Sequence, residues 1–191
     1  MSVNRKQDIL NAATKSFSLF GYKATTMDQV AKLANVGKGT IYTFFSNKEQ
    51  LFNEIIMDLI KQMEERASAV IDDANSFEEN VHHALFEMLG FRKEHQLMIK
   101  LFQEQRDIGT PIVNEVLDKV EDHILSFIKN KIATAIQRGE MKECDPEKFA
   151  YIILVTYIAF VFDWEKKREP LSENEIADIF KTYIFNGLSI K

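Results

Sequence analysis

Apolar residues recur three or four positions apart along nearly the whole chain, and no segment alternates apolar and polar positions over a strand-like length. Ile9, Ala13 and Phe17 show this spacing in the first predicted helix. The pattern predicts an all-α protein with about nine helices. The predicted helices are one that Gly21 ends, then about 27–34, 38–44 and 47–71, one from Ser76 through Phe91, a shorter one to about Asp107, one from Pro111 to Gly139, and two near 146–166 and 172–188.

Polar residues at the predicted helix starts support these boundaries. A Ser or Thr followed three residues later by Glu or Gln forms a capping box, in which each side chain satisfies the other residue's free backbone N–H. Proline suits the first helical position, and it follows Thr110 and Asp145. The predicted capping boxes are Thr26 with Gln29, Ser46 with Glu49, Ser76 with Glu79, and Ser172 with Glu175.

The composition is that of a globular chain rather than a disordered or collagen-like one. Its 191 residues are 46% hydrophobic and 28% charged, with 7 Gly and 3 Pro. The single cysteine, Cys144, excludes an intramolecular disulfide and a cysteine-cluster zinc site. Charged residues interrupt the first twenty positions, and the longest uncharged run, Phe149–Phe162, has fourteen residues where a membrane span needs about 20. We therefore expect a cytoplasmic protein without a membrane segment.

The net charge of −5 hides an asymmetry. Residues 1–50 contain seven Lys and Arg against three Asp and Glu, a net charge of +4, whereas the rest of the chain has a net charge of −9. A basic head on an acidic body suggests a polyanion-binding unit, although scattered charges also fit an ordinary solvated surface. No linker rich in Gly, Ser or Pro separates the two parts. We predict one domain over 1–50 that continues through the helix at 47–71 into a second domain over 51–191.

The two short helices at 27–34 and 38–44 have the proportions of a helix-turn-helix unit. Such a unit suits DNA because its second helix fits the major groove and presents side chains to the bases. Two-helix turns are also common in all-α proteins, so the spacing alone is a weak signal. The stretches FGYKATTMDQVA at 20–31 and ANVGKGTIYTFFSNKEQL at 34–51 are more specific, because they closely resemble the DNA-binding domain of TetR/AcrR-type regulators. The resemblance covers roughly residues 5–52.

Physical chemistry suggests roles for several residues of this region. Thr25 and Thr26 stand at the start of a helix, whose N-terminal N–H groups and dipole suit a phosphate. Lys38 is able to donate to guanine O6 and N7, and Thr43 is able to meet a thymine methyl. The candidate DNA-binding residues are Thr25, Thr26, Gly37, Lys38, Gly39, Thr40, Tyr42, Thr43, Phe44 and Lys48.

The resemblance implies that Tyr42 and Lys48 contact the DNA backbone as a phenol and a cation. The chain also departs from the family pattern. Gly37 stands where Ser is frequent, Asn35 where Gly is usual, and Phe44 where a polar aromatic residue such as His is common. Asn tolerates the left-handed conformation that ends a helix, so the turn is expected to form. The contact of Phe44 is expected to be apolar or absent.

For the rest of the chain the resemblance implies a ligand-sensing body and a homodimer formed by the last two long helices. The segment Phe149–Phe162 agrees, because it is apolar on all sides, more than a single bundle requires. The 15 Phe and 7 Met favour an apolar or amphipathic effector, since Met suits adaptable apolar surfaces. Candidate pocket residues are Met88, Phe91, Met98, Phe102, Phe127, Tyr151 and Tyr157, and candidate dimer residues are Phe160, Trp164, Phe180 and Tyr183.

These observations predict a ligand-responsive transcriptional regulator, a repressor that binds a palindromic operator in double-stranded DNA as a dimer and is released by its effector. No nucleophile-elbow, phosphate-loop or zinc-protease motif occurs, so we expect neither an enzyme nor a cofactor. Glu79 and His82 have the spacing of one di-iron ligand pair but lack a second pair, so no metal site is expected. The alternatives are a helical-bundle enzyme or carrier with a structural head, and a protein-binding helical module.

Overall fold

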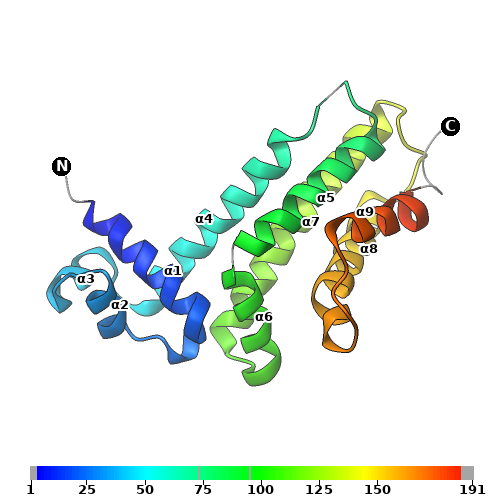
Figure 1. Ribbon diagram of the computed structural model, residues 1–191. Coiled ribbons are helices and arrows are strands. Elements are labelled where there is room, and N and C mark those ends of the chain that lie inside the picture. The colour runs from blue at the N-terminus through cyan, green and yellow to red at the C-terminus, as the bar shows by residue number, and fades with distance from the viewer. Residues whose placement is uncertain (1–3, 73, 95, 186–191) are drawn as a thin grey trace. The chain divides into compact units, whose positions relative to one another are not determined.

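The computed structural model describes residues 4–72, 74–94 and 96–185, and the regular elements in these ranges are all helical (Figure 1). This confirms the predicted all-α class. Within the described residues the α-helices are α1 (Arg5–Ala24), α2 (Met27–Leu33), α3 (Lys38–Phe44), α4 (Lys48–Ala69), α5 (Phe77–Glu94), α6 (Gln96–Ile108), α7 (Pro111–Gln137), α8 (Pro146–Ile158) and α9 (Glu173–Ile179). None of these helices is long and apolar enough to cross a membrane.

Local capping signals account for several helix starts. Predicted capping boxes form with both reciprocal hydrogen bonds at Thr26 with Gln29, Ser76 with Glu79, and Ser172 with Glu175. At the start of α8, the Asp145 carboxylate accepts hydrogen bonds from the N–H groups of Glu147 and Lys148. Pro146 occupies the first helical position there, as predicted.

The start of α4 differs from the prediction by one residue. The side chain of Asn47, rather than that of Ser46, accepts a hydrogen bond from the N–H of Gln50 over 2.8 Å. The Gln50 side-chain oxygen in turn accepts from both the N–H and the hydroxyl of Ser46. Ser46 and Asn47 are both good caps, and Glu49 and Gln50 both suit the third helical position, so the motif fits two registers and the helix uses the second.

Three of the four described residues with positive φ, all of them at helix ends, lie where the sequence predicts a stop. Gly21 has a φ of 82° and interrupts the helical conformation near the end of α1. Asn35 has a φ of 52° after α2, and Gly139 has a φ of 72° after α7. These values confirm the predicted stops at both glycines and the left-handed conformation of Asn35.

The chain folds into two compact units. Unit 1 comprises Met1–Lys61 and Glu94–Val120, and unit 2 comprises Gln62–Lys93 and Glu121–Lys191. Unit 1 therefore contains α6 and the first part of α7 as well as the N-terminal helices, and it extends beyond the predicted head of residues 1–50. The functional boundary at residue 50 stays a prediction.

Unit 1 is built on the apolar stripe of α1. Ile9 and Phe17 of this helix are fully buried, as are Val30 of α2 and Ile41 of α3. The ring of Phe17 meets that of Phe52 edge-on, with 5.1 Å between centroids. On another side, α1 packs along α6. The short helices α2 and α3 are thus held by a small core whose centre is α1 (Figure 1).

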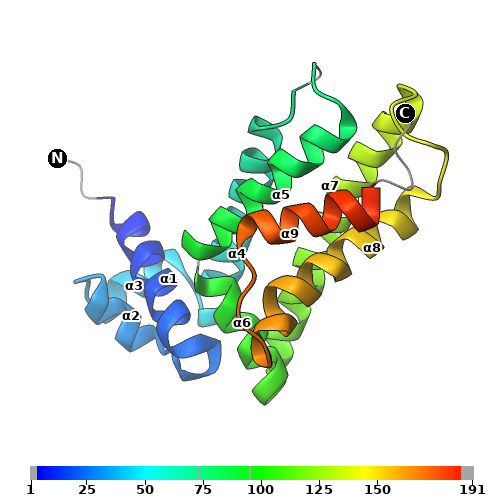
Figure 2. The ribbon, with the colours of Figure 1, turned by 45° about the vertical axis from the view of Figure 1, so that its right-hand side comes forward.

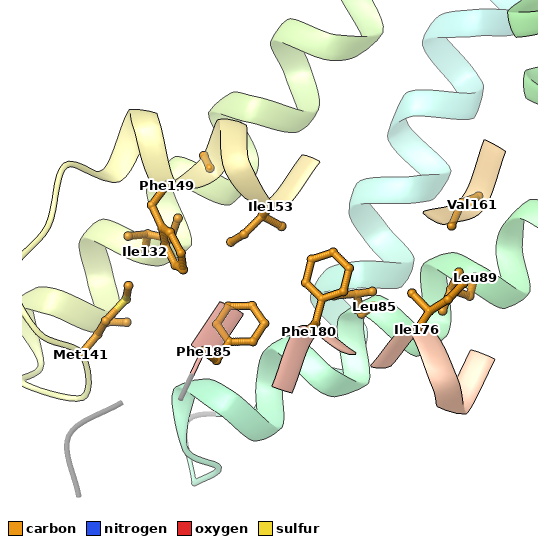
Figure 3. Packing of buried hydrophobic residues seen from close by; sticks show 12 residues of the cluster. Leu85, Leu89, Ile132, Met141, Phe149, Ile153, Val161, Ile176, Phe180 and Phe185 are labelled. Carbon is orange, nitrogen blue, oxygen red and sulfur yellow. The ribbon is translucent and has the colours of Figure 1, made fainter. Parts of the chain in front are cut away.

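Unit 2 is held by an apolar cluster rich in phenylalanine (Figure 3). The Phe185 ring lies 6.0 Å from that of Phe149 and 6.2 Å from that of Phe180, measured between centroids. Within this unit α8 and α9 lie side by side (Figure 2). The buried members of the cluster are Leu85, Leu89, Ile132, Ala135, Met141, Phe149, Ala150, Ile153, Val161, Ile176, Phe180 and Phe185.

Both of the last two predicted helices change their pitch near the end. α8 continues as a π-helical turn, η1 (Ala159–Asp163), and a 3₁₀ turn, η2 (Trp164–Lys166). α9 continues as the π-helical turn η3 (Phe180–Phe185). The predicted end of the last helix at residue 188 lies outside the described residues.

Candidate nucleic-acid interface

The helix-turn-helix forms at the predicted positions. The turn between α2 and α3 contains Asn35, and after it the N–H of Val36 donates to the Ala31 carbonyl over 3.0 Å. Gly37 then caps α3: its carbonyl accepts from the N–H of Thr40 over 2.9 Å, but no side chain caps this helix. The turn therefore joins two seven-residue helices in the arrangement that DNA-binding proteins use.

One side of α3 faces the core and the rest faces solvent. Ile41 within the helix and Phe45 directly after it are fully buried and anchor α3 to unit 1. The exposed or half-exposed residues of α3 are Lys38, Gly39, Thr40, Tyr42, Thr43 and Phe44. The Thr43 hydroxyl donates to the Thr40 carbonyl over 2.6 Å, which leaves the Thr43 methyl group for an apolar contact. Six of the predicted DNA-binding residues are thus displayed on one short helix.

Lys38, the first residue of α3, is paired with a carboxylate of α2. Its ammonium donates to Asp28 Oδ2 over 2.9 Å, and both side chains are exposed. This hydrogen bond, together with the charge of Asp28, raises the pKa of Lys38 above its ordinary value. An ammonium has three N–H donors, so the pair leaves two of them for a base or a phosphate.

Lys48 is turned toward the protein backbone. Its ammonium donates to the carbonyls of Tyr22 and Thr25 over 2.8 and 2.9 Å, and it lies 4.2 Å from the centre of the Tyr22 ring. Burial lowers the pKa of Lys48, and the charge of Glu104 opposes this shift. Burial, and after it the charges of Glu49 and Glu104, raise the pKa of the Tyr22 phenol. Since two of its donors are used internally, Lys48 has one left for a phosphate.

Thr25 and Thr26 differ in their surroundings. Thr25 is fully buried, and its hydroxyl donates to the Gly21 carbonyl over 2.8 Å and pairs with the Ser16 hydroxyl over 3.0 Å. This corrects the expectation that the Thr25 hydroxyl faces a phosphate. Thr26 is exposed, and its hydroxyl caps α2 by accepting from the N–H of Gln29 over 3.2 Å.

Sequence reasoning missed Glu104, which contacts the segment leading into the helix-turn-helix. Glu104 is 5% exposed, and its carboxylate accepts hydrogen bonds from the N–H groups of Tyr22 and Lys23 over 2.6 and 3.0 Å. A signal was present in the sequence. Glu104 follows Leu101 by three positions on the buried side of α6, where a carboxylate requires donors.

The predicted pocket residues are distributed over both units. Phe91 and Met98 are buried, and Met88, Phe102, Phe127 and Tyr157 are half-buried. Met98 and Phe102 belong to unit 1 and the others to unit 2. Tyr151 is 54% exposed and lies with the exposed residues Ile152 and Val155 on α8. It is therefore placed on the surface rather than inside the body, which corrects that expectation.

The predicted dimer residues also divide. Phe180 is 1% exposed and belongs to the unit 2 core, so it is not available to a partner, which corrects its assignment. Tyr183, three residues later, is 78% exposed. Phe160 and Trp164 are half-buried, with 5.7 Å between ring centroids. Periodicity cannot separate these positions, because large apolar residues stand at adjacent positions in these segments, as Ile179 and Phe180 do.

Within the part of the chain that the structure describes, no group of three or more His, Cys, Asp or Glu side chains is placed to hold a metal ion. The Glu79 carboxylate is engaged as a cap, since it accepts from the N–H and the hydroxyl of Ser76. The Ser76 N–H contributes most to lowering the pKa of Glu79. His82 lies against the Phe86 ring, with 6.4 Å between centroids.

Known proteins share both the motif and the fold. The family model for "Bacterial regulatory proteins, tetR family" matches residues 9–55. The chain is 57% identical over 189 residues to the uncharacterized HTH-type transcriptional regulator YhgD of Bacillus subtilis (strain 168), covering 99% of each chain.

Two solved structures extend the comparison to the whole fold. The regulator FadR from Bacillus subtilis, in complex with stearoyl-CoA, matches with a TM-score of 0.77 and 21% identity over 93% of this chain and 98% of that one. AibR in complex with isovaleryl coenzyme A and operator DNA matches with a TM-score of 0.69 and 22% identity over 95% of this chain and 98% of that one. At these identities, the two structures establish the shared fold alone.

Proposed function

The chain belongs to the tetR family of bacterial regulatory proteins, which are DNA-binding transcriptional regulators, and from this premise we propose how it works. We infer a repressor that binds a palindromic operator as a homodimer and leaves it when an amphipathic effector binds. Residues 1–50 read the DNA, and residues 51–191 bind the effector and the partner subunit. The protein acts by binding rather than by catalysis, and it acts in the cytoplasm, where its operator is.

The observation that carries the proposal is the exposed side of α3. A buried pair, Ile41 and Phe45, anchors this helix, while Lys38 and Thr43 are left at the surface. Lys38 supplies donors for guanine, and the Thr43 methyl group supplies an apolar contact for thymine. Contacts of these two kinds distinguish base pairs in the major groove, so α3 is proposed as the helix that reads sequence.

The phosphate contacts lie on either side of the reading helix. Thr26 stands at the N-terminus of α2, where free N–H groups and the helix dipole favour an anion. Tyr42 is exposed on α3, and Lys48 keeps one N–H donor, so both are available to the phosphates of the DNA backbone. These contacts fix the position of α3 on the duplex without reading its sequence.

The homodimer is proposed to use the outer side of α8 together with the end of the last helix. Tyr151, Ile152 and Val155 are exposed large apolar residues on α8, and Tyr183 is exposed in η3. Apolar surface of this kind is more often an interface than free surface. A two-fold dimer presents two copies of α3, so the operator is expected to contain two inverted half-sites.

The effector is proposed to be an acyl-coenzyme A thioester. Two regulators with the same fold hold such ligands, stearoyl-CoA in FadR and isovaleryl coenzyme A in AibR. The half-buried Met88, Phe127 and Tyr157 supply apolar and adaptable surface in unit 2 for an acyl chain. Such a ligand lowers DNA affinity only if it binds more tightly to the conformation that does not fit DNA than to the one that does. The difference between these two affinities limits the effect.

Selection of duplexes from a random pool by the purified chain tests the DNA part. We expect one enriched sequence with two inverted half-sites. Lys38→Ala should relax the preference at one base pair and cost about 1–3 kcal/mol there. Tyr42→Phe and Lys48→Ala should weaken binding to selected and scrambled duplexes alike. Enrichment of no sequence above the scrambled pool would contradict the proposal.

Two controls support the interpretation of these binding measurements. Lys48 also holds two backbone carbonyls, so the unfolding of Lys48→Ala has to be measured beside its DNA binding. Lys15→Ala removes an exposed lysine of α1 that makes no predicted contact, and it should leave the preference among duplexes unchanged.

Thermal unfolding with stearoyl-CoA, isovaleryl-CoA and free coenzyme A tests the effector. One of the acyl thioesters should raise the melting temperature more than coenzyme A does and should release the selected duplex in a competition titration. A thioester that stabilises the fold but leaves DNA affinity unchanged would contradict the proposed coupling.

A further inference from the structure

A carboxylate and an ammonium both bind the backbone of the segment that joins α1 to α2. In this α1–α2 joint (residues 21–25), the N–H groups of Tyr22 and Lys23 donate to Glu104, over 2.6 and 3.0 Å. The carbonyls of Tyr22 and Thr25 accept from Lys48, over 2.8 and 2.9 Å. The carboxylate binds two backbone donors of the joint and the ammonium binds two of its acceptors, so four backbone groups of this short segment are held by side chains.

The joint is shaped to receive the carboxylate. Gly21 has a φ of 82°, which turns the chain so that the next two N–H groups both reach Glu104. A Cβ added at Gly21 would lie 2.4 Å from Glu104 Oε2. Only glycine therefore permits both the backbone conformation and this close approach.

Glu104 is buried more completely than its charge would normally allow. Among the side chains that the structure describes, it is the one charged group in the buried class. The Thr110 hydroxyl donates to it over 2.8 Å, in addition to the two N–H groups, so donors surround both oxygens. An apolar residue on this side of α6 would avoid the cost of burying a carboxylate, but it would leave these three donors without an acceptor. What the carboxylate adds is direction, because hydrogen bonds hold the joint in one orientation and apolar contacts do not.

The joint leads directly into the DNA-reading part of the chain. Thr26, the next residue, is the cap of α2, and the Thr25 hydroxyl returns to the Gly21 carbonyl over 2.8 Å. A change in the backbone of the joint would therefore change the orientation of α2. It would also change that of α3, which follows α2 after a short turn.

We propose that Glu104 is a positioning residue for DNA binding, which holds the α1–α2 joint in the orientation that places α2 and α3 correctly on DNA. The proposal rests on the DNA-reading function proposed above, and it assigns to α6 a polar role in that function. Glu104 itself does not touch DNA.

Two substitutions at Glu104 test its positioning role. Glu104→Gln keeps the shape but places an amide NH₂ where one carboxylate oxygen accepted a hydrogen bond, and Glu104→Leu replaces the carboxylate by an apolar group. Both should weaken binding to the selected duplex by at least about tenfold. Glu104→Leu should also lower the melting temperature, because the N–H groups of Tyr22 and Lys23 and the Thr110 hydroxyl lose their acceptor. A merely structural role would lower the affinity of the folded protein no more than a packing variant of α6 that is destabilised to a similar extent.

Leu101→Ala is the matched control on the same helix. Leu101 is fully buried one turn earlier on α6, and its truncation should lower the melting temperature while leaving the dissociation constant of the folded protein for the duplex within about twofold. Amide proton spectra give a second readout. The Tyr22 and Lys23 signals should move upfield in both Glu104 variants and stay in place in Leu101→Ala.

The outcomes are distinguishable. If both Glu104 variants bind the selected duplex with the affinity of the wild type, the proposed role of Glu104 is overturned and the DNA-binding function still stands. A loss of affinity in Leu101→Ala as large as that in Glu104→Leu would also overturn it, because affinity would then follow packing. If the wild type selects no duplex at all, the DNA-reading function fails, and this inference fails with it.

Discussion

In unit 1, two charged side chains bind the backbone of a segment distant in sequence, whereas in unit 2 the distant segments are connected mainly by apolar side chains. Glu104, which is buried, and Lys48, which is half-buried, bind N–H and carbonyl groups of the α1–α2 joint. In unit 2 the Tyr157 hydroxyl donates to the Met88 carbonyl over a longer 3.4 Å. In unit 2 the ion pairs between separate helices, Arg66 with Glu87 and Lys129 with Glu147, retain substantial exposure, and pairs of that kind contribute little.

The difference matches the tasks that the two units are proposed to perform. A helix that reads base edges has to be oriented within a fraction of an ångström, and directional hydrogen bonds provide such orientation. A body that accommodates an effector has to adapt its packing, and apolar cores tolerate changes of side chain when their volume is kept. Substitutions should therefore affect stability most in unit 2 and DNA binding most in unit 1.

The largest expected effect is the loss of stability in Phe180→Ala. Phe180 lies within the unit 2 cluster, and removing its ring should lower the free energy of unfolding by about 3–5 kcal/mol, since a cavity adds to the lost burial. Asp178→Ala, two residues earlier, is the control, because this side chain is exposed and its loss should cost within about 0.5 kcal/mol. Urea unfolding measures both, and equal losses would remove the distinction between the buried and the exposed side of this segment.

A smaller loss of stability is expected from Thr25→Val in unit 1. Valine has nearly the same shape, so the change removes only the hydroxyl that donates to Gly21 and pairs with Ser16. Leaving buried polar groups without a partner should cost about 1–3 kcal/mol of unfolding free energy. A double-mutant cycle with Ser16→Ala checks the cause, since the double variant should lose less than the sum of the two single losses. Additive losses would show that the hydroxyl pair contributes nothing.

The sequence predicts what depends on neighbouring residues. The bounds of α3, the capping of α2 and the left-handed Asn35 are confirmed because each is decided within three or four positions. The predicted start of α4 was wrong by one residue, because Ser46 and Asn47 both cap well and local preferences do not choose between them.

What the sequence did not predict depends on contacts between distant segments. Glu104 binds residues about eighty positions earlier in the chain, and its place on α6 indicates only that some donor must meet it. Thr25 and Thr26 look equivalent in sequence, yet one is buried and the other exposed. Tyr151 lies in a segment that is apolar on every side, and Phe180 lies in one whose large apolar residues stand at adjacent positions, so periodicity does not distinguish core from surface.

A moderate effect on DNA binding is expected from Asp28→Asn. The change removes the carboxylate that holds Lys38 and also a negative charge beside the proposed reading helix. Exposed pairs of this kind contribute little, so affinity should rise only about two- to fivefold, for selected and scrambled duplexes alike. The gain should be smaller in a protein that already carries Lys38→Ala. Titrations at several salt concentrations measure this, and an equal gain in the Lys38→Ala background would show that the ion pair does not restrain Lys38.

The smallest effect is expected from Gly37→Ser at the start of α3. Gly37 has a φ of −68° and a ψ of 150°, which serine adopts without strain, and an added Cβ would have ordinary contact with the Thr40 hydroxyl at 3.7 Å. The serine hydroxyl would supply the side-chain cap that α3 lacks, so the free energy of unfolding should rise by about 0.5–1 kcal/mol without loss of DNA affinity.

Gly39→Ala is the paired variant. It has open space for its methyl group and a better helix propensity, so it should stabilise α3 by a similar amount. Because Gly39 is exposed on the proposed reading helix, its new methyl group should weaken binding to the selected duplex, whereas Gly37→Ser should not. Equal DNA affinities in the two stabilised variants would mean that the backbone of α3 does not approach the bases at Gly39.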